Sequence, residues 1–423
     1  MSKYIRIVLG LFIVISFIGC LPEKKMPIPR NLEMIYNPTT SSLYPEYSFY
    51  NIDDSTSILV GQIASNKLLY NNAAYKNKLT SRVKVIYSLY NLDKKNRLVD
   101  SLATNFIFEK DISQEYHSIE IPVRAKLGKD YILEIITRDL NRKNENYTFL
   151  KIERSSSTLQ DFLLRDSASY NLIVKPELNF VKEFTVEHYK NNYDSLNVFF
   201  FKKNNAIPAF PESNDSIQYN YVKSDSSWVC YLDSIKYESY TQEGNYYFTN
   251  KSVPKGGFVF SYFGPDFPNV NTVDKMIKPL AYIGFNDTTL CPDSIGRLKL
   301  AIDSFWLQRA SNVDRARDLI QLFYNRVIMA NKYFTSFVEG WQTDRGMIYI
   351  TYGIPDYVFK SDLEEKWIYS PIDLGTGISF TFKYKKNPFS LNHYELDRKK
   401  LKDAAWDSVL QKWELGEIIY YQK

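Results

Sequence analysis

The chain has 423 residues, a formal net charge of +5, and a composition that is 44% hydrophobic and 24% charged. These values are ordinary for a folded protein of two or three domains, and they exclude both a long disordered chain and a strongly basic nucleic-acid-binding protein. Aromatic residues make up 16% of the sequence, and this content favours β-strands because flat rings pack well across a pleated surface.

The first 19 residues have the pattern of a lipoprotein signal peptide. Lys3 and Arg6 precede an apolar run over residues 7–18, which ends in Gly19 and Cys20 as a lipobox would. The run has about 12 residues, whereas a helix that spans a membrane needs roughly 20. We therefore expect Cys20 to be the first mature residue and to carry acyl chains such as palmitate, with residues 20–31 as a polar tether.

The residue after Cys20 bears on the membrane to which the anchor would go. Leu21 stands where an aspartate would resemble an inner-membrane retention signal, so we expect lipid anchoring at the outer membrane. The sequence leaves open whether the protein faces the periplasm or the cell exterior.

Residues 32–154 are predicted to form a β-sandwich. Apolar and mixed positions alternate over residues 82–90 and 131–138, as expected of half-buried strands. Turn-rich segments at 91–96, 128–130 and 141–146 separate these runs at the spacing of an immunoglobulin-sized sandwich.

Residues 158–290, which follow the serines at 155–157, are predicted to form a second, sandwich-like β-domain. Candidate strands cover residues 197–202, 227–232, 245–250 and 257–263, with loops rich in Pro, Asn and Ser between them. Cys230 and Cys291 are the two cysteines that follow Cys20 in the sequence. They could form a disulfide or remain two free thiols, and the sequence leaves these alternatives equally open.

The pattern changes near residue 293 and predicts an α+β module over residues 293–423. Apolar residues at helical spacing indicate helices over about 295–306 and 316–334, with Ser311 as the expected cap of the second. Alternation predicts strands at 347–352, 367–369 and 378–384, and residues 399–415 are expected to form a final helix. The predicted fold class is therefore a multidomain protein, with N-terminal all-β sandwich domains followed by a C-terminal α+β module.

This module contains the motif Gly340, Trp341, Gln342, Thr343, Asp344, which resembles the signature of the GWxTD domain-containing family. The resemblance implies an envelope lipoprotein of the Bacteroidetes type with no established reaction. It extends over Phe305, Trp306, Arg309, Tyr324, Arg326, Asn331, Arg345, Gly346, Tyr352, Gly353, Pro355, Asp356, Trp367 and Tyr369.

The motif places the carboxylate of Asp344 beside the guanidinium of Arg345, and Asp356 offers a second carboxylate. A catalytic role and a structural role are both open to these residues. Asp344 and Asp356 would serve as general acid and base if burial separated their pKa values. The favoured role is structural: Asp344 would bind loop N–H groups, and Arg345 would pair with an acid. Asp356, Glu364 and Glu365 are the candidates for that acid.

Other signals of catalysis or cofactor binding are missing from the sequence. His117, His188 and His393 lie far apart without a zinc-ligand spacing. No nucleophile elbow, zincin or dinucleotide motif occurs, so we expect no cofactor and no metal site. The sequence predicts a scaffold or adaptor that engages another envelope protein and is not an enzyme. The alternative is a lipoprotein that binds or processes carbohydrate with Asp344 and Asp356.

Overall fold

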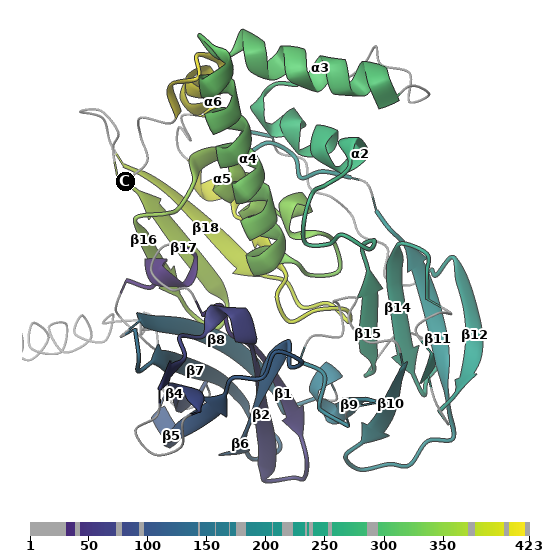
Figure 1. Ribbon diagram of the computed structural model, residues 1–423. Coiled ribbons are helices and arrows are strands. Elements are labelled where there is room, and N and C mark those ends of the chain that lie inside the picture. The colour runs from purple at the N-terminus through teal and green to yellow at the C-terminus, as the bar shows by residue number, and fades with distance from the viewer. Residues whose placement is uncertain are drawn as a thin grey trace, which may run out of the picture.

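The computed structural model describes residues 31–38, 43–72, 78–92, 97–142, 144–156, 158–168, 170–174, 183–204, 206–213, 223–232, 235–236, 240–252, 256–285, 295–370, 377–401 and 406–418. The predicted signal peptide at 1–19, Cys20, most of the tether and Cys291 lie outside these residues. The described chain forms several antiparallel sheets and a C-terminal helical module (Figure 1), which confirms the predicted fold class.

The first part is a sandwich of two antiparallel sheets. One sheet has the order β1 (Glu46–Asn51), β2 (Thr56–Ala64), β6 (Tyr116–Arg124). The other has the order β3 (Asn71–Asn72), β4 (Leu79–Asn91), β7 (Asp130–Asp139), β8 (Asn144–Glu153), with β5 (Arg97–Glu109) paired to β4. The short helix η3 (Ser65–Lys67) follows β2. The predicted alternation over 82–90 is confirmed: the buried set is Val83, Val85, Tyr87 and Leu89.

The second part contains two further sheets around one aromatic core. A three-stranded sheet has the order β13 (Ile235–Lys236), β10 (Glu183–His188), β9 (Phe162–Asp166). A four-stranded sheet has the order β12 (Ser226–Tyr231), β11 (Ser195–Lys202), β14 (Gly244–Thr249), β15 (Phe258–Tyr262), which confirms the four predicted strands. Phe184 and Phe260 stack across the two sheets at 5.6 Å between ring centroids. The short helix η4 (Leu159–Asp161) connects the first part to the second.

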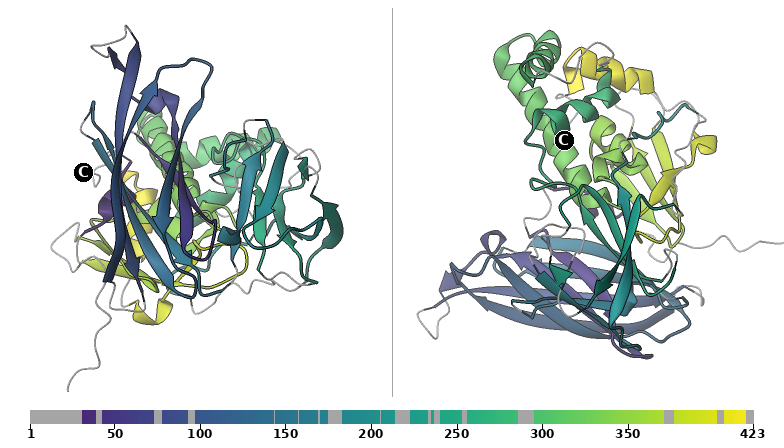
Figure 2. Two further views of the ribbon diagram at one scale, coloured as in Figure 1. Left: turned by 90° about the horizontal axis from the view of Figure 1, so that it is seen from below. Right: turned by 90° about the vertical axis from the view of Figure 1, so that its right-hand side faces the viewer.

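The C-terminal module packs helices against a sheet of the order β16 (Tyr357–Lys360), β17 (Glu364–Tyr369), β18 (Ile378–Tyr384), β19 (Tyr394–Leu396). The helices are α2 (Val273–Ile277), η6 (Lys278–Ile283), α3 (Ile295–Gln308), α4 (Val313–Phe334), η7 (Gly340–Gln342), α5 (Asp344–Tyr352), η8 (Arg398–Lys400) and α6 (Trp406–Glu414). Figure 2 shows the first sandwich across one end of this module, with the second part beside both. Among the described helices, none combines the length and the apolar character needed to cross a bilayer.

Three sequence predictions about this module are wrong in detail. Residues 347–352 belong to the helix α5 and do not form a strand. The prediction failed because the segment is buried on nearly every side, so its apolar residues show no periodicity that separates a helix from a strand. Asn312, not Ser311, caps α4, and its side chain accepts the N–H of Arg315 at 2.9 Å. The final helix α6 begins at Trp406, after the separate turn η8.

A short N-terminal segment, residues 31–36, packs into the C-terminal module, although it precedes the first sandwich in the chain. Asn31 donates through Nδ2 to the carbonyl of Asp356 at 2.8 Å and accepts the N–H of Val358 at 2.9 Å. Leu32 donates its N–H to the carbonyl of Val358 at 2.9 Å. Leu32 and Tyr36 are buried within the core of the module. Burial of side chains of this size stabilises by about 1.5–3 kcal/mol each.

Candidate functional site

The glycines and the threonine of the motif build the start of α5. Thr343 caps the helix: its hydroxyl accepts the N–H of Gly346 at 3.0 Å and donates to the carbonyl of Gly340 at 2.7 Å. A Cβ on Gly340 would lie 1.9 Å from the carbonyl oxygen of Ala330, and one on Gly346 would lie 1.9 Å from that of Gly340. Both positions therefore require glycine because backbone approaches backbone there.

Trp341 lies in the joint between the module and the second part. Its indole N–H donates to Glu339 at 2.6 Å, and its main-chain N–H donates to Asn331 at 3.1 Å. Glu339 also pairs with Lys203, which directly follows β11. Gln342 donates to the carbonyls of Asn204 and Ala206 at 3.0 and 3.1 Å. The Trp341 region thus ties helix and sheet together through buried polar contacts.

Asp344 is fully engaged by groups of the same module. One carboxylate oxygen accepts the N–H of Leu396 at 2.7 Å, and the two oxygens receive both terminal nitrogens of Arg398 at 2.7 and 3.3 Å. Such a bidentate pair is geometrically specific. Asp344 accepts a main-chain N–H as predicted, but this N–H comes from Leu396 in strand β19 and not from a loop. The pairing with Arg398 was not predicted from the sequence.

Arg345 belongs to a second buried charge cluster. It donates to Glu365 at 3.2 Å and to the side chain and carbonyl of Asn392 at 2.7 and 2.8 Å. Glu365 also accepts from Lys360 at 3.3 Å and from the Trp367 indole at 2.7 Å. Burial alone would raise the pKa of Glu365, but Lys360 and Arg345 outweigh burial and lower this pKa to about 2. Of the three acids predicted for Arg345, Glu365 is the partner.

The remaining motif residues hold the end of α5 and the surrounding core. Arg326 donates to the carbonyls of Ile350 and Thr351 at 2.8 and 3.1 Å, and burial lowers its pKa to about 10. Gly353, the residue after α5, has a φ of +89° and a ψ of −152°, a backbone conformation that favours glycine. Asp356 accepts the N–H of Ser370 at 2.6 Å. The other positions, all within the module, are Phe305, Trp306, Arg309, Tyr324, Tyr352, Pro355, Trp367 and Tyr369.

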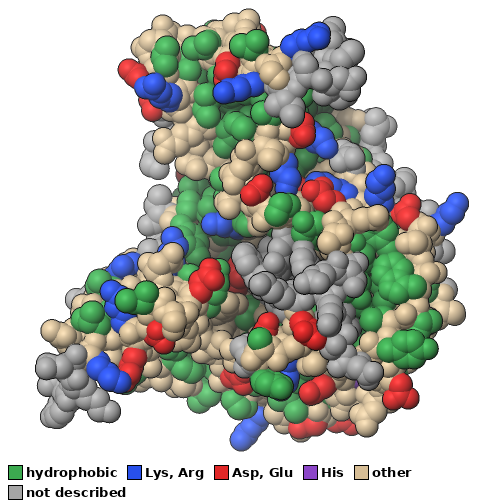
Figure 3. Space-filling view, turned by 45° about the vertical axis from the view of Figure 1, so that its right-hand side comes forward, with side chains coloured by type: hydrophobic (Ala, Val, Ile, Leu, Met, Phe, Trp, Pro, Cys, Tyr) green, Lys and Arg blue, Asp and Glu red, His purple; other side chains and the backbone are tan. Residues whose placement is uncertain are grey.

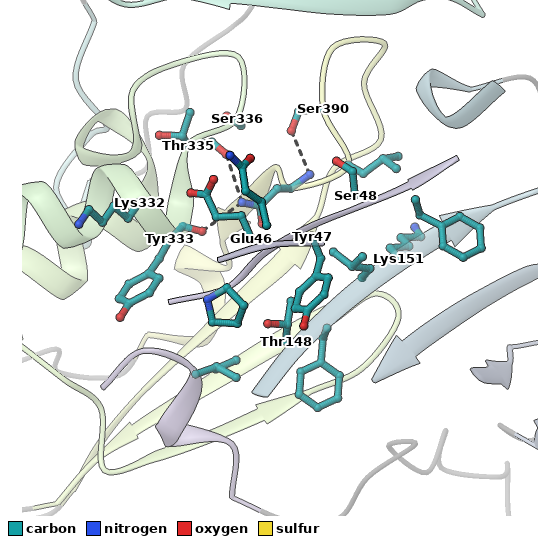
Figure 4. A pocket seen from close by; sticks show the side chains of 18 of the residues that line it. Glu46, Tyr47, Ser48, Thr148, Lys151, Lys332, Tyr333, Thr335, Ser336 and Ser390 are labelled. Carbon is teal, nitrogen blue, oxygen red and sulfur yellow. Dashed lines mark hydrogen bonds between the residues drawn. The ribbon is translucent and has the colours of Figure 1, made fainter. Parts of the chain in front are cut away.

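The three parts enclose a cavity of about 580 Å³ where they meet. Its walls come from β1 and β8 of the first sandwich, from β15 of the second part, and from the end of α4 and the 389–394 loop of the module. Figure 4 shows side chains of β1, including Glu46 and Tyr47, between those of Tyr333 from α4 and Lys151 from β8. The volume falls within the usual range of ligand pockets, about 300–1,000 Å³.

Tyrosine, hydroxyl and amide groups dominate the polar lining of the cavity. Besides Tyr44 and Tyr333, the lining contains Ser48, Thr148, Gln160, Ser261, Thr335, Ser336, Ser390 and Asn392. Lys67 and Lys332 come from different parts of the chain and each place the side-chain nitrogen 5.7 Å from the Tyr44 ring centroid. Sequence reasoning missed this site because its walls are far apart in the sequence and form no local motif.

The family comparison agrees with the position of the motif. The family model of the GWxTD domain matches residues 244–415. The chain is a GWxTD domain-containing protein. The matched region of this GWxTD protein begins at the first residue of β14 and includes β15, α2 and η6 as well as the predicted module. A comparison with curated protein sequences finds no match.

The solved structures that are similar to the GWxTD protein include two enzymes of Bacteroides species, each matched over a small part of its chain. A beta-glucuronidase of Bacteroides uniformis is 13% identical over 29% of this chain and 13% of that enzyme, with a TM-score of 0.18. A putative beta-galactosidase from Bacteroides fragilis is 10% identical over 28% and 17% of the two chains, with a TM-score of 0.17. The matched part is less than a fifth of either enzyme.

The two acids considered as a catalytic pair have different hydrogen-bond partners in the GWxTD protein. Asp344 lies at the first residue of α5 and Asp356 lies beyond its last, and neither is among the residues that line the cavity. The histidines are similarly separated: His117 lies in β6, His188 in β10 and His393 just before β19. Within the part of the chain that the structure describes, no group of three or more His, Cys, Asp or Glu is placed to hold a metal.

Proposed function

We propose that this GWxTD protein is an outer-membrane lipoprotein, anchored through Cys20, that acts by binding another envelope protein. The observation that carries the proposal is the cavity where the first sandwich, the second part and the GWxTD module meet. Concave sites between domains are the usual places where proteins hold ligands. Because all three parts contribute walls, an occupant of the cavity would contact each of them.

The contacts of the motif support binding over catalysis. Asp344 is held by Arg398 and a main-chain N–H, and Glu365 is held by Arg345 and Lys360. A general acid or base needs an accessible carboxyl whose pKa lies near the working pH. The pKa of Glu365 is moved the other way, to about 2. These charges stabilise the module, which positions the walls of the cavity.

The outer surface of the second part supports a role in protein contact. The edge strand β12 exposes Trp228, Val229 and Tyr231, of which Tyr231 is 70% accessible. Figure 3 shows apolar side chains on this flank, while charges of both signs are spread over the same face. Exposed aromatic side chains on an edge strand are typical of surfaces that bind other proteins.

The proposed role is tested with the tagged, full-length protein in its own membranes. Thr148→Trp would fill part of the cavity, and Ile112→Trp, at a position that is 98% exposed and outside the cavity, is the matched control. We expect the wild-type protein and the control to co-purify with the same partner, and Thr148→Trp to lose it. Equal recovery by all three proteins would contradict a role for the cavity.

The anchor is tested separately. We expect Cys20→Ser to move the protein from the membrane fraction to the soluble fraction after a salt wash, because the acyl chains would be its attachment. A folded Cys20→Ser protein that still sediments with membranes, or a native protein without acyl groups by mass spectrometry, would overturn the lipoprotein proposal.

A further inference from the structure

We propose that the cavity binds an extended segment of the partner protein as an added β-strand along β1. This inference rests on the proposed binding function and names its mode of recognition. The occupant is a polypeptide in strand conformation, recognised chiefly through its main-chain N–H and C=O groups.

The first observation is that two strands at sheet edges line the cavity with consecutive residues, besides single residues of interior strands such as Gln62 of β2 and Ile132 of β7. Successive side chains of a strand point to opposite faces, so a sheet face would contribute every second residue. The cavity is instead lined by the consecutive residues 43–50, which include most of β1, and by 146–151 of β8. Consecutive residues line a space when the strand presents its edge to it.

The second observation is the place of these strands in their sheets. Among the described strands, β1 pairs with β2 alone, β8 with β7 alone, and β15 with β14 alone. Each is therefore the last strand of its sheet, and all three sheets end at the same cavity. An edge strand points the N–H and C=O of alternate residues away from its neighbour, and these groups are the template for an added strand.

We choose β1 because it offers the longest consecutive lining and runs through the cavity (Figure 4). Tyr47 and Phe49 point into the sandwich core, where both are buried. Ser48 lies between them on the opposite face and is half-buried. A six-residue strand is about 20 Å long, and an added strand would lie about 4.8 Å from it. The cavity volume of about 580 Å³ accommodates a short extended segment and excludes a folded helix pair or domain.

The opposite walls of the cavity suit the side chains of such a segment. Tyr333 and Thr335 come from the end of α4, and Phe389 and Asn392 come from the 389–394 loop. Rings supply apolar contact, and hydroxyl and amide groups adapt to different side chains. The main chain of β1 would thus provide affinity, and the module would provide selectivity between segments.

The test uses the full chain as Cys20→Ser, to keep it in solution, and a random twelve-residue peptide library from which binders are selected. The selected peptide is then resynthesised with single N-methyl groups, each of which removes one main-chain N–H. We expect methylation at every second residue to weaken binding about two- to tenfold, and methylation at the intervening residues to leave it unchanged. Uniform effects along the peptide, or selection of no peptide, would overturn the proposal.

Cavity variants make the site assignment independent of the peptide chemistry. Ser48→Trp and Thr148→Trp place bulk on β1 and β8, and Ile112→Trp is the control outside the cavity. We expect both cavity variants to lose the peptide and the control to retain it, with melting temperatures confirming that each protein is folded. If a cavity variant does not fold, the methylation series alone decides.

A crosslinking experiment separates failure of the binding mode from failure of the proposed function. A photoreactive phenylalanine analogue is placed at position 48, at 148 or at the control position 112 of the anchored protein in its own membranes. Crosslinks from 48 and 148 to one contiguous segment of one partner support strand addition. A partner crosslinked from 112 alone overturns strand addition and leaves the adaptor role standing. Crosslinks to glycans or to no protein overturn both.

Discussion

Glu365 offers the sharpest test of how the GWxTD module is held together. It is fully buried and is the carboxylate that faces both Arg345 and Lys360. Glu365→Gln keeps the shape and an acceptor for the Trp367 indole but leaves the two cations without their counter-charge. The lowering of the Glu365 pKa from 4.5 to about 2 corresponds to about 3 kcal/mol of stabilisation at pH 7. Breaking a buried ion pair on one side costs about 3–5 kcal/mol, which agrees.

The pH dependence of the Glu365 effect has a defined sign. A carboxyl whose pKa is lowered in the folded state adds stability above its unfolded pKa, here 4.5. That stability is lost as the pH falls through 4.5 towards 2, because the unfolded chain then takes up the proton first. The difference between wild type and Glu365→Gln should therefore shrink from about 3 kcal/mol at pH 7 to about 1 kcal/mol at pH 3.

The assay is urea unfolding followed by tryptophan fluorescence. Trp306, Trp341, Trp367, Trp406 and Trp413, five of the six tryptophans, lie within the matched GWxTD region. Glu364→Gln is the matched control, because Glu364 points to the other face of β17 and should change stability by less than about 0.5 kcal/mol. Equal stability of Glu365→Gln and wild type, or a difference that does not shrink in acid, would refute the buried-pair argument.

Three further predictions concern other parts of the module. Trp341→Ala should lower the free energy of unfolding by about 3–5 kcal/mol, since it leaves a cavity in a packed joint; unchanged thermal melting would make Trp341 a contact residue instead. Asp344→Asn should lower the free energy of unfolding by about 1.5–3 kcal/mol, because it removes the carboxylate charge that pairs with Arg398. Full stability with complete loss of cellular function would favour catalysis. Leu32→Ala should lower the free energy of unfolding by about 2–5 kcal/mol and shift the unfolding transition detected by tryptophan fluorescence. A shift seen only in the unfolding of the β-sheets, measured by circular dichroism, would contradict the packing of residues 31–36.

Elements with one buried and one exposed face were predictable from the sequence. The strand predicted at 378–384 coincides with β18, because Phe380 and Phe382 face the core while Ser379 and Lys383 face solvent. The strand predicted at 347–352 is wrong for the opposite reason. Residues Met347 to Thr351 of α5 are all buried, so hydrophobicity recurs at every position and cannot distinguish a helix from a strand.

The charge partners were only partly accessible to sequence reasoning. Glu365 shares the alternation of Trp367 and Tyr369 in β17, and that alternation marks it as a buried acid on the core face. Arg398 carries no comparable signal, because its pairing with Asp344 depends on how β19 and η8 return to the start of α5. The cavity depends on the convergence of three sheet edges, a property of the tertiary arrangement alone.

The packing of residues 31–36 also sets the order in which the molecule can be completed. The bond from Asn31 to Asp356 joins residues that are 325 positions apart, so the earliest described residues have no native site until nearly the whole chain has been made. Until then Leu32 and Tyr36 remain unburied, at the stage when growing chains are most prone to aggregate. Closing so long a loop adds little entropy cost beyond that of a shorter one. Burial of this segment therefore requires that the chain has been made at least as far as β16, and a chain cut short before β16 would lack the hydrogen-bond partners of Asn31 and Leu32.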